Sequence, residues 1–233
     1  TMPEKAKQFS LHVIDSSLND SANRLNELPS APLNAQAAKF VKLYLKVHSQ
    51  SLLQVEKRSP KYFAVIDSVF IAYGLPVELK YLSVIESRLQ SKAVSPVGAV
   101  GVWQFMPETG KAMGLKINGK YDERKHFYKS TIAAAKYLKW LHSIFDDWLL
   151  VIAAYNGGPG VVFNAIKKSG SRNFWKMQYN MPAETRNHVK RFIGAHYYFE
   201  KTGSETTLTK AELATYQKTL AAFAIAQNTQ QNE

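Results

Sequence analysis

The chain has 233 residues, of which 45% are hydrophobic and 12% are aromatic. This composition excludes an intrinsically disordered chain, because it supplies ample apolar surface for a buried core. Lysine and arginine number 30 against 18 aspartates and glutamates, a formal net charge of +12 that favours polyanionic partners without choosing among nucleic acid, an acidic membrane surface and an anionic cell-wall polymer.

The residue pattern of the first third of the chain predicts an arm followed by two helices. Residues 1–34 are polar and broken by Ser, Asn and Pro, and we expect them to lie outside the core. Apolar residues at three-to-four spacing predict an amphipathic helix over 33–56. The Ser-Pro pair at 59–60 resembles an N-cap followed by proline at the first helical position, so a second helix is expected over 62–73, with Gly74 as its end.

A third helix is expected over 77–90, and a Gly- and Ser-rich loop over 91–101 follows it. This loop is long enough to line a site. Later helices are expected over 107–113, 130–145, 148–155, 161–168, 183–200 and 210–227. Asp146 is expected to cap the helix over 148–155. Because no segment alternates with period two, the predicted fold class is all-α with a single helical core.

One acidic residue of the third helix, Glu86, stands out. At about 100° per residue, Leu82, Ile85 and Leu89 share an apolar stripe, and Glu86 lies at its edge. Desolvation and the negative end of the helix dipole would both raise the pKa of such a carboxyl, as a general acid requires. Glu78 shares the face but lies in the first turn, where the dipole favours an acid. Geometry alone leaves a catalytic and a structural role for Glu86 equally open.

Four short segments add context to Glu86. They are Ile85-Glu86-Ser87, residues 98–109 (GAVGVWQFMPET), residues 154–160 (AYNGGPG) and Glu184-Thr185-Arg186. Together, in this order and spacing, they resemble the catalytic domain of lytic transglycosylases of the membrane-bound murein transglycosylase D-like group, which has a goose-lysozyme-like helical fold. The resemblance covers roughly 35–200, with a core at about 70–200, and leaves 1–34 as an N-terminal arm and 201–233 as a C-terminal helical extension.

The resemblance implies roles for individual residues. Glu86 falls on the glutamate that serves as the sole catalytic acid and base. Ser95 falls on a serine that orients this glutamate or the substrate acetamide, and Gln104 falls on a sugar-contacting glutamine. Tyr155 is expected near the catalytic carboxyl, and Asn156 is expected to hold the cleft.

Four further residues, in or next to these segments, are predicted to line the substrate cleft: Trp103, Met106, Glu184 and His188. Trp103 and Tyr155 are the candidates for packing against sugar rings. The other tryptophans, Trp140, Trp148 and Trp175, are expected in the core. His188 stands where many relatives carry a tyrosine, so its protonation would add a second pH dependence.

The resemblance also implies a mechanism. Glycosidases generally use two carboxyl groups, whereas this chain offers one well-placed candidate. The acetamide of N-acetylmuramic acid would trap the developing cation, and Glu86 would protonate the glycosidic oxygen and then accept the proton of the C6 hydroxyl. The product would be a 1,6-anhydro sugar, formed without water.

Three alternatives remain open on the sequence. The charge of +12 is compatible with a nucleic-acid-binding helical protein, although the basic residues are dispersed and no recognised binding motif occurs. Because His188 replaces the tyrosine of many relatives, the chain is also compatible with a wall-binding scaffold that has no catalytic activity. A lysozyme-like muramidase, which hydrolyses the same bond, would need a second carboxylate or a positioned water.

The remaining expectations concern cofactors, partners and location. Without cysteine or a two-His metal spacing, no metal is expected, and the resemblance implies no cofactor. The implied partner is the peptidoglycan glycan strand rather than nucleic acid, bound by a monomer. The implied location is the periplasm or outer membrane of a Gram-negative bacterium, with peripheral or lipid-anchored association. The longest clean apolar run, 148–155, is too short to span a bilayer, and the N-terminus shows no export signal.

Overall fold

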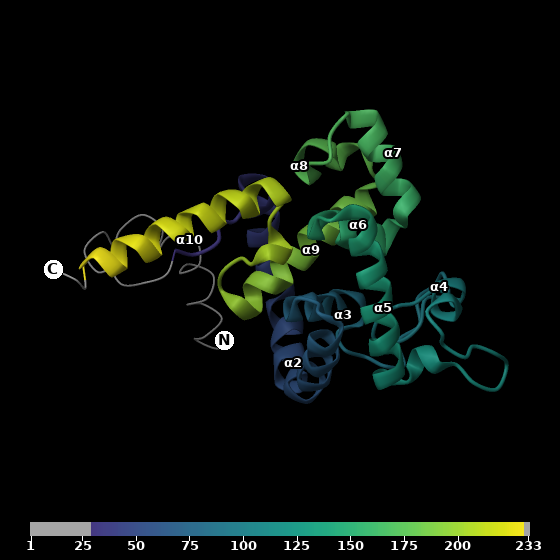
Figure 1. The fold of residues 1–233 in the computed structure, drawn as a ribbon. Coiled ribbons are helices and arrows are strands. Elements are labelled where there is room, and N and C mark those ends of the chain that lie inside the picture. Colours follow the sequence, from purple (N-terminus) through teal and green to yellow (C-terminus); the bar gives the residue numbers. More distant parts are fainter. Residues whose placement is uncertain (1–28, 231–233) are drawn as a thin grey trace.

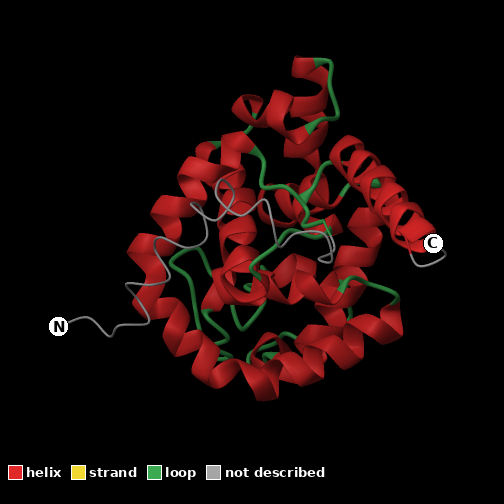
Figure 2. Cartoon of the chain, turned by 90° about the vertical axis from the view of Figure 1, so that its left-hand side faces the viewer, coloured by secondary structure: helices red, strands yellow, loops and turns green. Residues whose placement is uncertain are grey.

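The computed structural model describes residues 29–230, and every regular element in that range is a helix (Figures 1 and 2). Residue pairs with β-type bonding occur there only as isolated bridges, three of which lie within 94–122. The predicted all-α class is confirmed. Most of the expected arm, residues 1–28, lies outside the described residues.

The first helix that the structure describes, α2, runs unbroken from Ala35 to Tyr73 with Pro60 inside it. The prediction of two helices was therefore wrong. Proline at 60 provides no N–H for the carbonyl of Glu56, four residues earlier, but the Ser59 hydroxyl donates to that carbonyl at 3.0 Å. The serine thus replaces the missing backbone bond, and α2 continues until Gly74 adopts φ 67°, the predicted end.

The helix that carries Glu86 is shorter than predicted. It begins as a 3₁₀ turn, η2 (Val77–Lys80), and continues as α3 (Tyr81–Ser87). Arg88 and Leu89 then adopt φ values of 55° and 64°, and the Leu89 amide bonds back to the Ser83 carbonyl at 3.2 Å. Two consecutive left-handed non-glycine residues therefore end the helix at Ser87, one residue after Glu86.

The later helices agree with the predicted ranges to within a few residues. They are α4 (Pro107–Ala112), α5 (Phe127–Phe145), α6 (Trp148–Gly157), α7 (Pro159–Ser169), α9 (Ala183–Glu200) and α10 (Lys210–Gln230), with 3₁₀ turns η3 (Glu123–Lys125), η4 (Gln178–Asn180) and η5 (Glu205–Thr207). The short α8 (Phe174–Met177) was not predicted. Asp147, not Asp146, caps α6 by accepting from the amides of Leu149 and Leu150, whereas Asp146 ends α5 with φ 49°.

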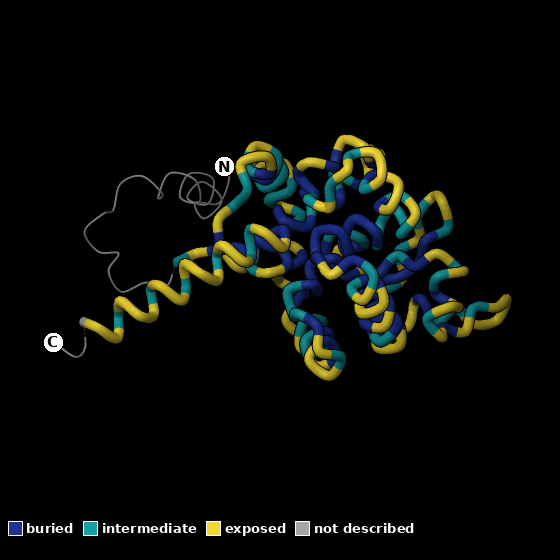
Figure 3. The backbone as a smooth tube through the Cα atoms, turned by 45° about the horizontal axis from the view of Figure 1, so that its top comes forward, coloured by how far each residue is buried: buried dark blue, intermediate teal, exposed yellow. Residues whose placement is uncertain are grey.

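The core is built around α6, whose residues 148–154 are all buried. Helices α5, α7 and α9 pack against α6, and α2 packs against α5 and α9. The buried segments gather in the middle of the molecule (Figure 3). Trp148 and Trp175 are buried as predicted, but Trp140 is 46% exposed on the outer side of α5, where it stacks on Tyr137. Helix α10 extends away from this body (Figure 1). Across the described range, none of the helices combines the length and apolarity that crossing a membrane requires.

Candidate active site

Glu86 lies in the last turn of α3, and its side chain is 15% exposed. The next residue, Ser87, anchors this turn by donating from its hydroxyl to the Val102 carbonyl at 2.8 Å. The side chain of Glu86 lies near His188 of α9 and Tyr155 of α6. Non-glycine residues in strained backbone conformations, such as Arg88 and Leu89, cluster at functional sites.

Burial raises the pKa of Glu86 to about 8. The positive charge of Arg191 acts against this shift, and the negative charge of Glu184 adds to it. Because burial outweighs the charge of Arg191, the carboxyl holds its proton at neutral pH while part of it still reaches solvent. This is the state in which a carboxyl can act as a general acid.

His188 on α9 faces Glu86, with 3.4 Å between its Nε2 atom and the Glu86 Oε1 atom. Burial, helped by the Arg191 charge, lowers the pKa of His188 to about 3. The imidazole is therefore neutral at every pH above this value, and the proton of the pair resides on Glu86. The second pH dependence expected from His188 is consequently moved out of the neutral range.

Tyr155 joins α6 to the loop that follows α3. Its hydroxyl donates to the Trp103 carbonyl at 2.8 Å. Burial raises the pKa of Tyr155, and the nearby Glu86 contributes to this rise. Tyr155 therefore lies near Glu86, and its contact with a substrate stays a prediction. Asn156, the next residue, is half-buried at the same end of α6.

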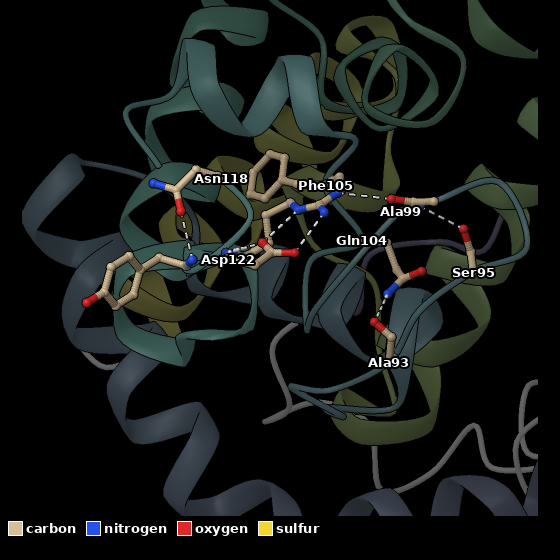
Figure 4. A network of polar contacts seen from close by, with 10 residues as sticks. Ala93, Ser95, Ala99, Gln104, Phe105, Asn118 and Asp122 are labelled. Atoms are coloured by element: carbon tan, nitrogen blue, oxygen red, sulfur yellow. Dashed lines mark hydrogen bonds and ion pairs between the residues drawn. The ribbon is translucent and has the colours of Figure 1, made fainter. Parts of the chain in front are cut away.

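The loop over 91–105 folds back on itself beside α3 (Figure 4). The Ser95 hydroxyl accepts from the Ala99 amide at 2.9 Å, and the Gln104 side chain donates to the Gly101 carbonyl at 2.8 Å. Both side chains thereby stabilise the loop itself, and neither bonds to Glu86. Gln104 adopts φ 49°, another left-handed residue at this site.

Arg124 holds this loop against the body of the protein. Its guanidinium donates to the carbonyls of Gly98 and Phe105, each at 2.9 Å, and pairs with the carboxylate of Asp122 (Figure 4). The arginine is 7% exposed, so these bonds are largely shielded from water. Sequence reasoning missed Arg124, because nothing in its own segment signals contact with a loop some 20 residues earlier.

Gly101 packs against the backbone at Arg124, and we predict that Gly101→Ala unfolds this loop. An alanine Cβ would lie 1.9 Å from the Arg124 carbonyl oxygen, and φ there is 88°. We expect a loss of at least about 3 kcal/mol in the free energy of unfolding, measured by chemical denaturation. Gly98→Ala is the matched control, since φ is 87° and no atom lies within 4 Å of the added Cβ. It should cost only about 1–2 kcal/mol; equal losses in the two variants would contradict the prediction.

The other predicted cleft residues divide into buried and exposed. Trp103 has no exposed surface, packs on Phe70 and donates its indole N–H to Thr131, so it cannot present its ring to a sugar; this prediction was wrong. Met106 is 44% exposed, and Glu184 is exposed in the first turn of α9. Sequence reasoning missed Arg191, although it lies seven residues after Glu184 and three after His188, the spacing of one helix face.

The fold and the site together define an all-helical protein in which one protonated carboxyl is held at the end of a short helix. Within residues 29–230, no group of three or more His, Asp or Glu side chains is arranged to hold a metal ion. Residues 72–178 match the family model described as the Transglycosylase SLT domain.

Individual relatives agree with this match. The chain is 35% identical over 167 residues to the membrane-bound lytic murein transglycosylase D of Escherichia coli strain K12; the match covers 70% of this chain and 36% of that protein. It is 32% identical over 129 residues to the peptidoglycan transglycosylase gp16 of Escherichia phage T7, covering 54% of this chain and 9% of the phage protein. The chain thus spans about a third of the length of the first relative.

Solved structures share the fold. The 70 kDa soluble lytic transglycosylase SLT70 from Escherichia coli superposes with a TM-score of 0.57 at 23% identity, over 76% of this chain and 31% of that one. An inactive mutant of the lytic transglycosylase Slt from Pseudomonas aeruginosa gives a TM-score of 0.55 at 24% identity, over 71% of this chain and 29% of that one. These similarities confirm the predicted lysozyme-like helical architecture.

Proposed function

We propose that this chain is a peptidoglycan lytic transglycosylase that cleaves the β-1,4 bond between N-acetylmuramic acid and N-acetylglucosamine without water. The observation that carries the proposal is the state of Glu86, a carboxyl that is 15% exposed and has a pKa of about 8. Relatives named as murein and peptidoglycan transglycosylases supply the substrate class.

In the proposed first step, the Glu86 O–H donates its proton to the glycosidic oxygen while the bond from this oxygen to C1 of N-acetylmuramic acid breaks. The acetamide oxygen of the same sugar bonds to C1 and stabilises the developing positive charge. The N-acetylglucosamine side leaves with a hydroxyl group. Because His188 is neutral and its pKa lies about five units below that of Glu86, the histidine does not compete for the proton.

In the second step, the Glu86 carboxylate accepts the proton of the C6 hydroxyl as O6 attacks C1 and displaces the acetamide oxygen. A 1,6-anhydro ring forms, and Glu86 regains its starting proton. We propose that Tyr155 and Asn156 border the reacting sugar and that Met106, Ser95 and Gln104 line or shape the adjoining loop. Glu184 and His188 border Glu86 from the side of α9.

Hydrolysis is the second candidate, and Glu184 is the observation that favours it. Its negative charge is close enough to raise the pKa of Glu86, so a second carboxylate is present on the facing helix. In an inverting hydrolase such a group would act as the base for an attacking water. Glu184 is exposed at the start of α9, where the helix dipole also stabilises an acid.

The mass of the products separates the two candidates. We expect purified murein sacculi incubated with the protein to release muropeptides that end in 1,6-anhydro-N-acetylmuramic acid, one water lighter than hydrolytic products. Glu184→Gln should leave this product unchanged. Products that carry a reducing end, and are lost in Glu184→Gln, would instead establish hydrolysis.

The proposal also concerns location and assembly. A murein substrate and a membrane-bound relative favour action in the periplasm or at the outer membrane, either free or peripherally attached. The net charge of +12 favours binding to glycan strands that carry lactyl and peptide carboxylates. We propose a monomer that binds these strands without a cofactor.

A further inference from the structure

Basic and aromatic side chains from three helices gather on one side of Glu86. Arg88 is the C-cap residue of α3, Arg191 lies on α9, and Tyr44 and His48 lie one turn apart on α2. The ring centroids of Tyr44 and His48 are 4.7 Å apart. We call Tyr44, His48, Arg88 and Arg191 the basic cluster.

Close packing of α9 on α2 brings the basic cluster together. A Cβ atom at Gly194 would lie 2.6 Å from the Tyr44 ring, so glycine is what allows the two helices to approach. Arg191 precedes Gly194 by three residues and therefore lies on the same side of α9. Because the next turn back on this side carries His188, 3.4 Å from Glu86, Arg191 lies between the carboxyl and α2.

The electrostatics of the basic cluster agree with this placement. Burial raises the pKa of Tyr44 to about 12, and the charges of Arg191 and Arg88 act against the rise. Burial also lowers the pKa of His48, and the same two charges lower it further. Both arginines are therefore near both residues of α2, and Arg191 is also near Glu86.

Neither arginine has an ion-pair partner among residues 29–230, the part of the chain that the structure describes. The Nε atom of Arg191 is buried and has no hydrogen-bond partner, although a buried guanidinium N–H is ordinarily satisfied. Arg88 is exposed, so the cluster is open to solvent at that end. An anion entering from there would satisfy Arg191.

We propose that the basic cluster is a subsite for a carboxylate carried by the glycan substrate. The planar guanidinium groups of Arg191 and Arg88 donate to the carboxylate oxygens, and Tyr44 and His48 pack against the group that bears it. This inference rests on the proposed function. The carboxylate belongs either to the lactyl group of N-acetylmuramic acid or to the peptide stem attached there. The residues on α2 and Arg191 lie outside the family-matched range 72–178.

The test measures binding in a Glu86→Gln background, so that Arg191 cannot act through the pKa of Glu86. Three ligands are titrated by calorimetry. The first is chitotetraose, which is neutral. The second is a peptide-free tetrasaccharide in which N-acetylglucosamine and N-acetylmuramic acid alternate, and the third is the same tetrasaccharide with peptide stems. We expect Arg191→Gln and Arg88→Gln each to weaken binding of a carboxylated ligand by about tenfold or more and to leave chitotetraose unchanged. Lys168→Gln, exposed on α7, is the control for the loss of one charge.

The ligands also identify the source of the carboxylate. A loss on the peptide-free tetrasaccharide assigns the lactyl group, and a loss only on the peptide-bearing one assigns the stem. Equal losses on chitotetraose, or none in either arginine variant, would overturn the subsite. If Arg191→Gln does not fold, the binding measured with Arg88→Gln, at an exposed position, tests the subsite by itself. If the wild type releases anhydro products while both arginine variants bind normally, only the subsite fails; if no ligand binds and no product appears, the proposed function fails as well.

Discussion

Replacing Glu86 with glutamine is expected to lower turnover of murein sacculi by at least about a thousandfold. General acid-base catalysis contributes about 10²–10⁴ to a rate, and here one carboxyl is proposed to act in both steps. The amide keeps the size and hydrogen bonding of the protonated carboxyl but cannot release a proton. The measurement is the rate of muropeptide release, with circular dichroism to show that the variant is folded.

Glu78→Gln is the matched control for this experiment. Glu78 lies eight residues earlier, on η2, and is half-buried as Glu86 is. We expect it to retain the wild-type rate. A folded Glu86→Gln variant with wild-type turnover would remove Glu86 from the mechanism and with it the proposed function.

Glu86→Gln is also expected to stabilise the protein at alkaline pH. The pKa of Glu86 rises from an ordinary value of 4.5 to about 8 on folding, so between these values the folded state holds a proton that the unfolded state has lost. The free energy of unfolding of the wild type therefore falls as pH rises from 4.5 to 8. At about 1.4 kcal/mol for each tenfold change in proton affinity, this loss has an upper limit of roughly 4–5 kcal/mol.

Glutamine does not titrate, so Glu86→Gln should be close to the wild type in stability at pH 4.5 and more stable by up to about 4 kcal/mol at pH 8.5. Guanidinium denaturation of both proteins at the two pH values measures this difference, in which the contributions of all other titrating groups cancel. A difference that is the same at both pH values would show that the carboxyl of Glu86 is not held protonated by the fold. Active sites commonly trade stability for function in this way.

Local patterns predicted much of the fold correctly. The bounds of α9 over 183–200, the end of α2 at Gly74 and the apolar α6 all follow from helical spacing and from capping residues. The failure at Pro60 shows the limit of such rules. A Ser-Pro pair usually starts a helix, but here it lies inside one. The helix continues because the Ser59 hydroxyl donates to the Glu56 carbonyl, which proline leaves without a backbone partner.

Tryptophan burial could not be read from periodicity. Trp103 lies in a glycine-rich loop yet is fully buried, whereas Trp140 lies in a regular helix yet is 46% exposed. A helical period shows which residues share a face, but it does not show which face meets another element. That depends on how α5 packs against α6 and α2, which no local pattern contains.

By itself, the sequence determined the all-helical class and singled out Glu86, because a carboxyl at the edge of an apolar stripe shows in the spacing of neighbouring residues. Only the tertiary structure decided that His188 stays neutral, that Arg191 lies near Glu86 and that α9 packs closely on α2. The physical reason is that desolvation and charge act through space. They are set by side chains about 40 to 105 residues distant in the chain, which meet only when α2, α3 and α9 pack together.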